Sequence, residues 1–177
     1  MILASGAIRA EINIGNIVIR PYDDNQLNPN SYDLRLGSKI LVPKKYQRDV
    51  KVKTEYMEYI IPDEGFVLEE GVLYLSETLE YTETHGYLVP FIEGKSSVGR
   101  NGIAVHVTAG FGDIGFCGNW TLEIYTIGGS VRIYKGMKIC QITWERVEGP
   151  ISKVYEGKYQ NAHGVIGSKQ YEEFRNE

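Results

Sequence analysis

The chain has 177 residues, which fits one domain. Its net charge of −4 disfavours a general nucleic-acid-binding surface, because binding to a polymeric phosphate backbone needs a basic face. No segment has the pattern of a signal peptide or approaches a run of about 18 apolar residues, so the sequence predicts no membrane contact and a cytoplasmic location. The 20 glycines and 13 tyrosines indicate many turns and strands rather than a helix bundle.

The N-terminal part is predicted to form one helix and then short strands. Ser5 is a candidate cap for a helix that continues to about residue 13. Residues 31–36 alternate polar and apolar side chains, as a half-buried strand does, and Gly37 is expected to end that strand. Two further short strands are expected at 17–19 and 40–42.

The rest of the chain also shows mainly strand patterns. Residues 45–60 are rich in charge and indicate a solvated hairpin or excursion. Gly128-Gly129 lies between two apolar runs, 120–127 and 130–134, which predicts a hairpin. Other strands are expected near 66–69, 72–80, 87–92 and 137–147. An all-β sandwich or barrel of the jelly-roll type is the fold that this pattern favours.

Cysteine and histidine give no recognisable metal motif. Cys117 and Cys140 form no CxxC pair; we expect two reduced thiols, and a disulfide between them stays open. The three histidines belong to no HxE or HExxH pattern. A catalytic zinc site needs about three ligands at workable spacing, and the sequence offers no such set.

Glycine is concentrated in one window, with seven glycines among the 25 residues from Gly94 to Gly118. Such density is typical of backbone that turns tightly or approaches a ligand closely. The run from Gly94 to Arg100 holds hydroxyls, a lysine and an arginine. It fits an anion cradle, or alternatively a turn with capping serines, and it is not a Walker A loop.

Two acids stand out close to this window. Asp113 lies in an apolar, glycine-rich segment, where it either forms an Asx-turn or has a chemical task. Glu123 lies in a predicted strand, in which Thr121, Glu123 and Tyr125 share one face. A partly buried glutamate there suits a general base, and the alternative is an exposed acid on a solvated face.

Several motifs in order resemble the deoxycytidine triphosphate deaminase family, which shares its fold with the trimeric dUTP pyrophosphatases. The resemblance covers nearly the whole chain. It begins with the first residues and the N-terminal helix and continues through residues 30–37. It is strongest at 94–100, 105–109, 110–118 and 121–123, and it then runs through 135–139 to 157–159. The resemblance implies one domain over 1–177, with a mobile tail at 155–177. It also implies a mainly β, dUTPase-like barrel or jelly roll with short helices, and a homotrimer with sites between subunits.

The resemblance further implies roles for named residues. Glu123 would take a proton from the water that attacks cytosine C4, without zinc, and Ser96 and Arg100 would surround the amino group and that water. The triphosphate would be held with Mg²⁺ bridging its oxygens and bound by no protein ligand directly. Substrate contacts would come from Lys95, Ser97, Val107, Thr108, Ala109, Thr121, Tyr155 and Lys158.

The resemblance leaves the final product to be decided. Asp113 matches an aspartate that positions water for triphosphate cleavage in dUTP pyrophosphatases, and Gly110-Phe111 favours the bifunctional members that convert dCTP to dUMP. The alternatives are a deaminase that releases dUTP, a dUTP pyrophosphatase only, and a non-catalytic nucleotide-binding barrel. Inhibition by dTTP is expected. Lys95 replaces a common arginine, and Ala162-His163 stands where the family often has a glutamine, which affects the predicted phosphate contacts.

Overall fold

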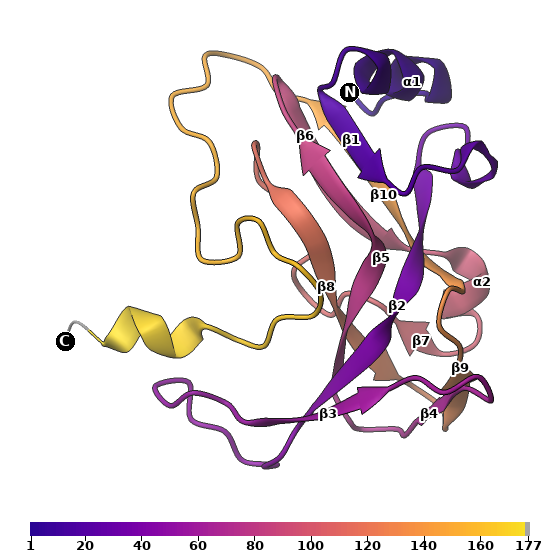
Figure 1. The fold of residues 1–177 in the computed structure, drawn as a ribbon, viewed down its shortest axis with the longest axis vertical. Coiled ribbons are helices and arrows are strands. Elements are labelled where there is room, and N and C mark those ends of the chain that lie inside the picture. The colour runs from indigo at the N-terminus through magenta and orange to yellow at the C-terminus, as the bar shows by residue number, and fades with distance from the viewer. Residues whose placement is uncertain (176–177) are drawn as a thin grey trace.

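The computed structural model describes residues 1–175, and strands dominate it (Figure 1). The strands are β1 (Ile17–Arg20), β2 (Tyr32–Pro43), β3 (Tyr56–Ile60), β4 (Phe66–Leu68), β5 (Tyr74–Thr84), β6 (Leu88–Gly94), β7 (Ile103–Ala104), β8 (Cys117–Thr126), β9 (Val131–Ile133) and β10 (Lys138–Arg146). The helices are α1 (Ser5–Asn13), α2 (Ser96–Gly99) and two 3₁₀ turns, η1 (Asp24–Gln26) and η2 (Gln170–Phe174).

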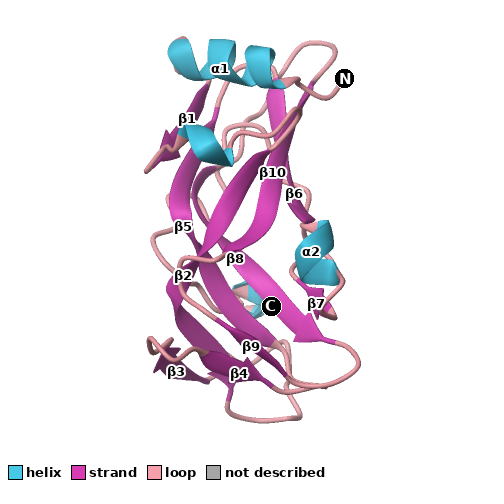
Figure 2. Cartoon of the chain, turned by 90° about the vertical axis from the view of Figure 1, so that its right-hand side faces the viewer, coloured by secondary structure: helices cyan, strands magenta, loops and turns pink. Residues whose placement is uncertain are grey.

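The main sheet is antiparallel and curls around one core (Figure 2). Its order is β6-β10-β2-β5-β8-β7, with β1 paired to β5 and β3 paired to β2, and β4 and β9 form a separate ladder. The result is a nearly closed barrel with α1 at one end. The predicted mainly β fold with a short N-terminal helix is therefore confirmed.

Alternation along β8 shows how the sequence builds the core. Leu122 and Ile124 are fully buried, while Thr121, Glu123 and Tyr125 on the other face are half-buried. Each fully buried aliphatic side chain contributes about 1.5–3 kcal/mol relative to exposure. The predicted division of β8 into two faces is confirmed.

The start of α1 differs from the prediction. Ser5 is the first helical residue, and Ala4 occupies the N-cap position. The alanine side chain has no polar atom, so no side chain caps this helix. The helix boundary itself agrees with the sequence pattern.

Gly37 does not end a strand, contrary to the sequence prediction. β2 runs without interruption from Tyr32 to Pro43, and its pairing with β5 shifts register between Leu36 and Ile40. The carboxylate of Glu77 fills this irregularity and accepts the backbone N–H groups of Ser38 and Lys39 at 3.1 and 3.3 Å. Gly37 thus allows a bulge within a continuous strand.

The predicted hairpin at Gly128-Gly129 is wrong in its pairing. The chain does turn there, and both glycines have positive φ. However, β9 pairs with β4, whereas β8 pairs with β5 and β7. The charged segment behaves as predicted, because residues 44–55 are mostly exposed and β3 returns alongside β2.

The C-terminal segment packs along β8. Asn161 donates its N–H to the carbonyl of Cys117 at 2.8 Å, and Asn119 donates to the carbonyl of Ala162 at 2.9 Å. Within residues 1–175, no helix has both the length and the apolar character that crossing a membrane requires. The mobility of residues 155–177 stays a prediction, and residues 176 and 177 lie outside the described part of the chain.

Candidate active site

A cavity of about 510 Å³ lies against the outer face of β8. Four parts of the chain enclose it: the charged excursion before β3, the loop between β7 and β8, β8 itself and the C-terminal segment. Glu123, Asp113, Ala109, Thr121 and Tyr155 all line it, so the fold brings together these five predicted site residues.

Glu123 points into this cavity from the middle of β8. Its Oε2 atom accepts the backbone N–H of Thr108 at 3.3 Å and the Thr108 hydroxyl at 3.4 Å. These two bonds fix one carboxylate oxygen to the β7–β8 loop. Within residues 1–175, the other oxygen makes no hydrogen bond or ion pair, so it can accept a hydrogen bond from a bound molecule.

His106 lines the same cavity next to Glu123. Burial of the ring lowers its pKa, and the Glu123 carboxylate acts in the opposite direction. Neither ring nitrogen has a hydrogen-bond partner within the described residues. A buried imidazole without partners is a polar group available to a bound ligand.

Asp113 lies on an exposed turn at the rim. Phe116 donates its N–H to the Asp113 carbonyl at 3.2 Å, and Gly115 has a φ of +86°, which favours glycine. Gly112 is required for a different reason: a Cβ there would lie 2.5 Å from the Trp120 ring. The glycine-rich window therefore lets this loop lie flat against Trp120 and hold Asp113 at the cavity.

The predicted anion cradle lies elsewhere in the chain. Ser96 and Ser97 are on α2, Arg100 follows it, and all three are exposed. α2 packs beside β7, on the opposite side of the molecule from the C-terminal segment that covers the cavity (Figure 1). Within one chain, the fold does not bring these residues to Glu123.

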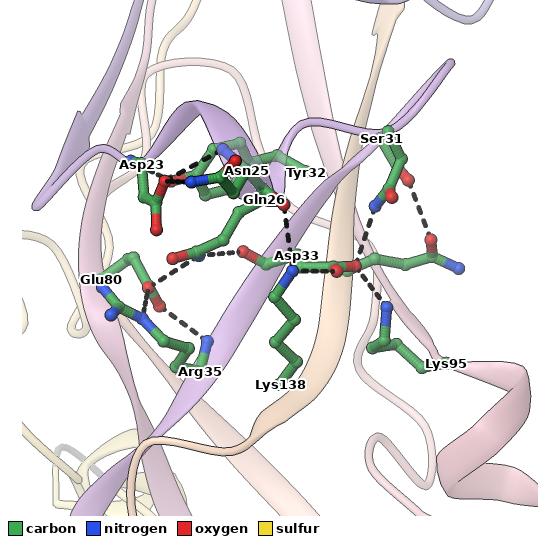
Figure 3. Close-up of polar contacts among 12 residues, drawn as sticks. Asp23, Asn25, Gln26, Ser31, Tyr32, Asp33, Arg35, Glu80, Lys95 and Lys138 are labelled. Atoms are coloured by element: carbon green, nitrogen blue, oxygen red, sulfur yellow. Dashed lines mark hydrogen bonds and ion pairs between the residues drawn. The ribbon is translucent and has the colours of Figure 1, made fainter.

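Lys95 takes part in a buried ionic network rather than in a free cradle (Figure 3). Its ammonium lies 2.6 Å from Oδ1 of Asp33, and Lys138 lies 3.3 Å from the other oxygen. Burial alone would raise the pKa of Asp33, but hydrogen bonds from Lys95, Asn28 and Lys138 outweigh it and the pKa is lowered. Lys95 thereby anchors the start of α2 to β2.

Of the two tail residues predicted to contact substrate, Tyr155 lines the cavity and Lys158 does not. Tyr155 packs its ring edge-on against Phe116, with centroids 5.8 Å apart. Lys158 forms an ion pair with Glu173 instead of facing the cavity, and this bond raises the pKa of Lys158. Thr121 accepts the N–H of Ile166 at 3.1 Å, so it also holds the segment in place.

The β7–β8 loop carries the remaining predicted contacts. Val107 and Thr108 are exposed and do not line the cavity, whereas Ala109 does. Sequence reasoning gave no role to His106 or Trp120, although both line the cavity. Nothing local marks them, since a lone histidine or tryptophan between strands is equally typical of the core.

Comparison with known families settles which one this fold represents. A family model described as dCTP deaminase-like matches residues 2–147. The chain belongs to this family. The predicted resemblance is confirmed, and the match spans the motifs from residue 30 to residue 139, whereas residues 157–159 lie beyond it.

Individual members of the dCTP deaminase-like family are similar along the whole chain. A protein of Cytophaga hutchinsonii named "dCTP deaminase, dUMP-forming" is 49% identical over 174 residues, covering 98% of this chain and 99% of that protein. One of the same name from Clostridium acetobutylicum is 48% identical over 176 residues, covering 99% and 100%.

A solved structure supports the fold. The 2'-deoxycytidine 5'-triphosphate deaminase from Agrobacterium tumefaciens superposes with a TM-score of 0.66 at 27% identity, covering 83% of this chain. This chain spans 48% of the length of that protein.

Proposed function

We propose that this chain is a bifunctional, dUMP-forming dCTP deaminase. It replaces the 4-amino group of dCTP by oxygen from water, releasing ammonia, and then cleaves the triphosphate with a second water to give dUMP and diphosphate. One observation carries the proposal: the two acids that these hydrolyses need, Glu123 and Asp113, line one cavity in a chain 49% identical to a protein named for that product.

Glu123 acts as the general base of the deamination. Thr108 holds one carboxylate oxygen, and the other accepts a proton from water as the hydroxide attacks C4. Glu123 then passes the proton to N3 and towards the departing ammonia. Because no metal lowers the pKa of this water, its positioning against C4 supplies more of the rate enhancement.

The site is completed by a neighbouring subunit of a homotrimer. Its walls carry three carboxylates, Asp49, Asp113 and Glu123, and a single arginine, Arg48. Such a cavity lacks the positive charge that a triphosphate requires. Arg100, with Ser96 and Ser97, is exposed on another face and free to enter the cavity of the next copy.

Asp113 serves the second hydrolysis. Its exposed carboxylate at the rim orients a water towards the α-phosphate, while cytosine C4 lies deeper, beside Glu123. The nucleotide enters as its magnesium complex, and the wall carboxylates are hard oxygen donors compatible with the water shell of that ion. Ala109 bounds the base, and Tyr155, Thr121 and a Lys158 released from Glu173 contact the rest of the nucleotide.

Two further expectations belong to the same site. dTTP shares the sugar and triphosphate of the substrate, so it inhibits by occupying the cavity. A cytoplasmic location stays a prediction.

Product analysis tests the proposal. The purified chain is incubated with dCTP and Mg²⁺, and ammonia, dUTP, dUMP and diphosphate are resolved. We expect equal amounts of ammonia and dUMP, with no build-up of dUTP. Asp113→Asn is expected to keep ammonia release within about threefold while dUTP accumulates, because only the second water loses its orienting group.

The control replaces another exposed acid, Glu64→Gln, and should leave both products unchanged. Ammonia together with dUTP from the wild type would instead establish the deaminase that stops at dUTP. No loss of dCTP, together with cleavage of dUTP supplied in a parallel incubation, would establish a pyrophosphatase. Nucleotide binding without any product would establish a binding barrel.

A further inference from the structure

A second cluster of chemically capable side chains lies outside the cavity, where β5 ends and β8 begins. It comprises Glu83, His85 and Cys117, whose potential ligand atoms all lie within 4.8 Å of one another. None of the three lines the cavity against Glu123. The mechanism proposed above uses none of them.

Strand geometry explains why these residues meet. Glu83 lies near the end of β5 and His85 directly follows that strand, so the two side chains, two residues apart, extend to the same side. Cys117 is the direct antiparallel partner of Glu83 on β8. The two-residue alternation of side chains along the strand and the pairing of β5 with β8 together place a carboxylate, an imidazole and a thiol on one outer patch.

The surrounding contacts orient the three side chains. Oε2 of Glu83 lies 3.0 Å from Nε2 of His85, while Arg20 binds the other carboxylate oxygen at 3.3 Å. Cys117 is half-buried, and its N–H donates to Oε1 of Gln160 at 3.0 Å. The Cys117 thiol donates to the Gly115 carbonyl at 3.5 Å. A second partner on a ligating carboxylate, as Arg20 is on Glu83, is typical of metal sites.

We propose that Glu83, His85 and Cys117 bind a transition-metal ion of the Zn²⁺ class. A thiolate and an imidazole select such an ion over Mg²⁺ or Ca²⁺, which prefer oxygen ligands. Binding converts the Cys117 thiol to a thiolate with release of one proton to solvent. The thiolate and carboxylate then balance the two positive charges of the ion.

The spacing needs a small adjustment. Tetrahedral ligands of zinc stand roughly 3.5 Å apart, so the more separated of these atoms must approach by side-chain rotation. The side chains of Glu83 and His85 are partly exposed and can make this movement. Because Cys117 also holds Gln160 and Asn161 through its backbone, the ion fastens β5 to β8 beneath the C-terminal segment.

Cobalt titration tests the site directly. The full chain, without a histidine tag and kept reduced, is titrated with Co²⁺, and its ligand-field and thiolate-to-metal absorption bands are recorded before displacement by Zn²⁺. We expect one Co²⁺ per chain with a thiolate band. His85→Ala and Cys117→Ser should each weaken binding by at least tenfold, and Cys117→Ser should abolish the thiolate band.

Two comparisons keep the result decisive. Cys140→Ala removes the other thiol, which is fully buried, and should retain the band. Glu83→Gln preserves side-chain shape, so weakened binding in this variant together with an unchanged circular dichroism spectrum separates lost coordination from lost folding. A wild-type chain that takes up no Co²⁺, or variants that bind it as tightly as the wild type, would overturn the proposal.

Discussion

His106 lies beside Glu123, and two opposing effects act on the pKa of its imidazole. The imidazole is buried with both nitrogens unpartnered, and its pKa is lowered by that burial despite the nearby carboxylate. The ring is therefore mostly uncharged at neutral pH. Among residues 1–175, Glu123 forms no ion pair, and an uncharged ring beside it adds none, which suits the proposed role of this carboxylate as a base.

The lowered pKa of His106 makes stability depend on pH. The unfolded chain protonates this ring near its ordinary pKa of 6.5, whereas the folded chain binds the proton only at lower pH. More protons are then bound in the unfolded state, so the free energy of unfolding falls as pH drops below 6.5, by at most about 1.4 kcal/mol per pH unit.

Urea unfolding between about pH 7.5 and pH 5.5 measures this effect at one protein concentration. His106→Gln should lose less stability than the wild type over that range. His163→Gln, at an exposed ring, should follow the wild type. Parallel curves for the wild type and His106→Gln would contradict the role given to burial.

A candidate site residue could be predicted when its neighbours in the sequence already marked it as unusual. Glu123 was found because a charged residue among apolar neighbours in a strand is visible in the sequence. His106 was not, because the loop between β7 and β8 folds it against Glu123. The proposed ligands Glu83, His85 and Cys117 were not, because the pairing of β5 with β8 brings them together.

At the scale of elements, β2 shows how one glycine changes pairing without ending a strand. The Glu77 carboxylate occupies the space beside Gly37 and accepts two backbone N–H groups of the bulge. Burial raises the pKa of Glu77, against the effect of those hydrogen bonds. A Cβ on residue 37 would lie 2.6 Å from Cγ of Glu77.

Gly37→Ala should therefore destabilise the fold by about 1–3 kcal/mol, because the glutamate must leave the position in which it satisfies the bulge. Gly6→Ala is the matched control: an added Cβ there meets nothing within 4 Å, and alanine favours the helix. It should leave stability unchanged or raise it by up to about 1 kcal/mol. Equal effects of the two substitutions in thermal or urea unfolding would refute this account of the bulge.

Element types were predictable, whereas strand partners were not. The two glycines after β8 do turn the chain, yet β9 leaves to pair with β4 through the Phe66–Ile133 register. A turn signal reports only local backbone preference. The pairing of β9 depends on which strand lets Ile133 reach the core, where this side chain is fully buried. The sequence around β9 does not show which strand that is.

At the scale of the whole molecule, the candidate site residues lie on two separate surfaces. Glu123 faces the cavity under the C-terminal segment, and Arg100 lies exposed after α2. In a cyclic homo-oligomer of three or more copies, each interface joins two different surfaces of neighbouring copies. The proposed trimer would in this way unite Glu123 of one copy with Arg100 of the next.

Mixing two inactive variants tests this arrangement. Glu123→Gln and Arg100→Ala chains, each without deaminase activity alone, are co-expressed in equal amounts. Random assembly then leaves both groups intact at about one quarter of the shared sites, so about a quarter of the wild-type rate of ammonia release should return.

The control mixes wild-type chains with Glu123→Gln chains, which should retain about half of the activity because only one group is affected. If the doubly variant mixture stays inactive although native mass spectrometry shows that it contains mixed trimers, the two groups act within one subunit. The shared-site proposal would then be abandoned, although the assignment of Glu123 would survive.

The alternation along β8 also bears on how enzymes of this shape can acquire new substrates. Leu122 and Ile124 are held by the core, while Thr121, Glu123 and Tyr125 stand on the face that bears the cavity. Substitutions on the cavity face of β8 leave the packing of Leu122 and Ile124 in the core largely unchanged. A single ten-residue strand thus lets evolution vary chemistry and fold almost independently, one residue apart.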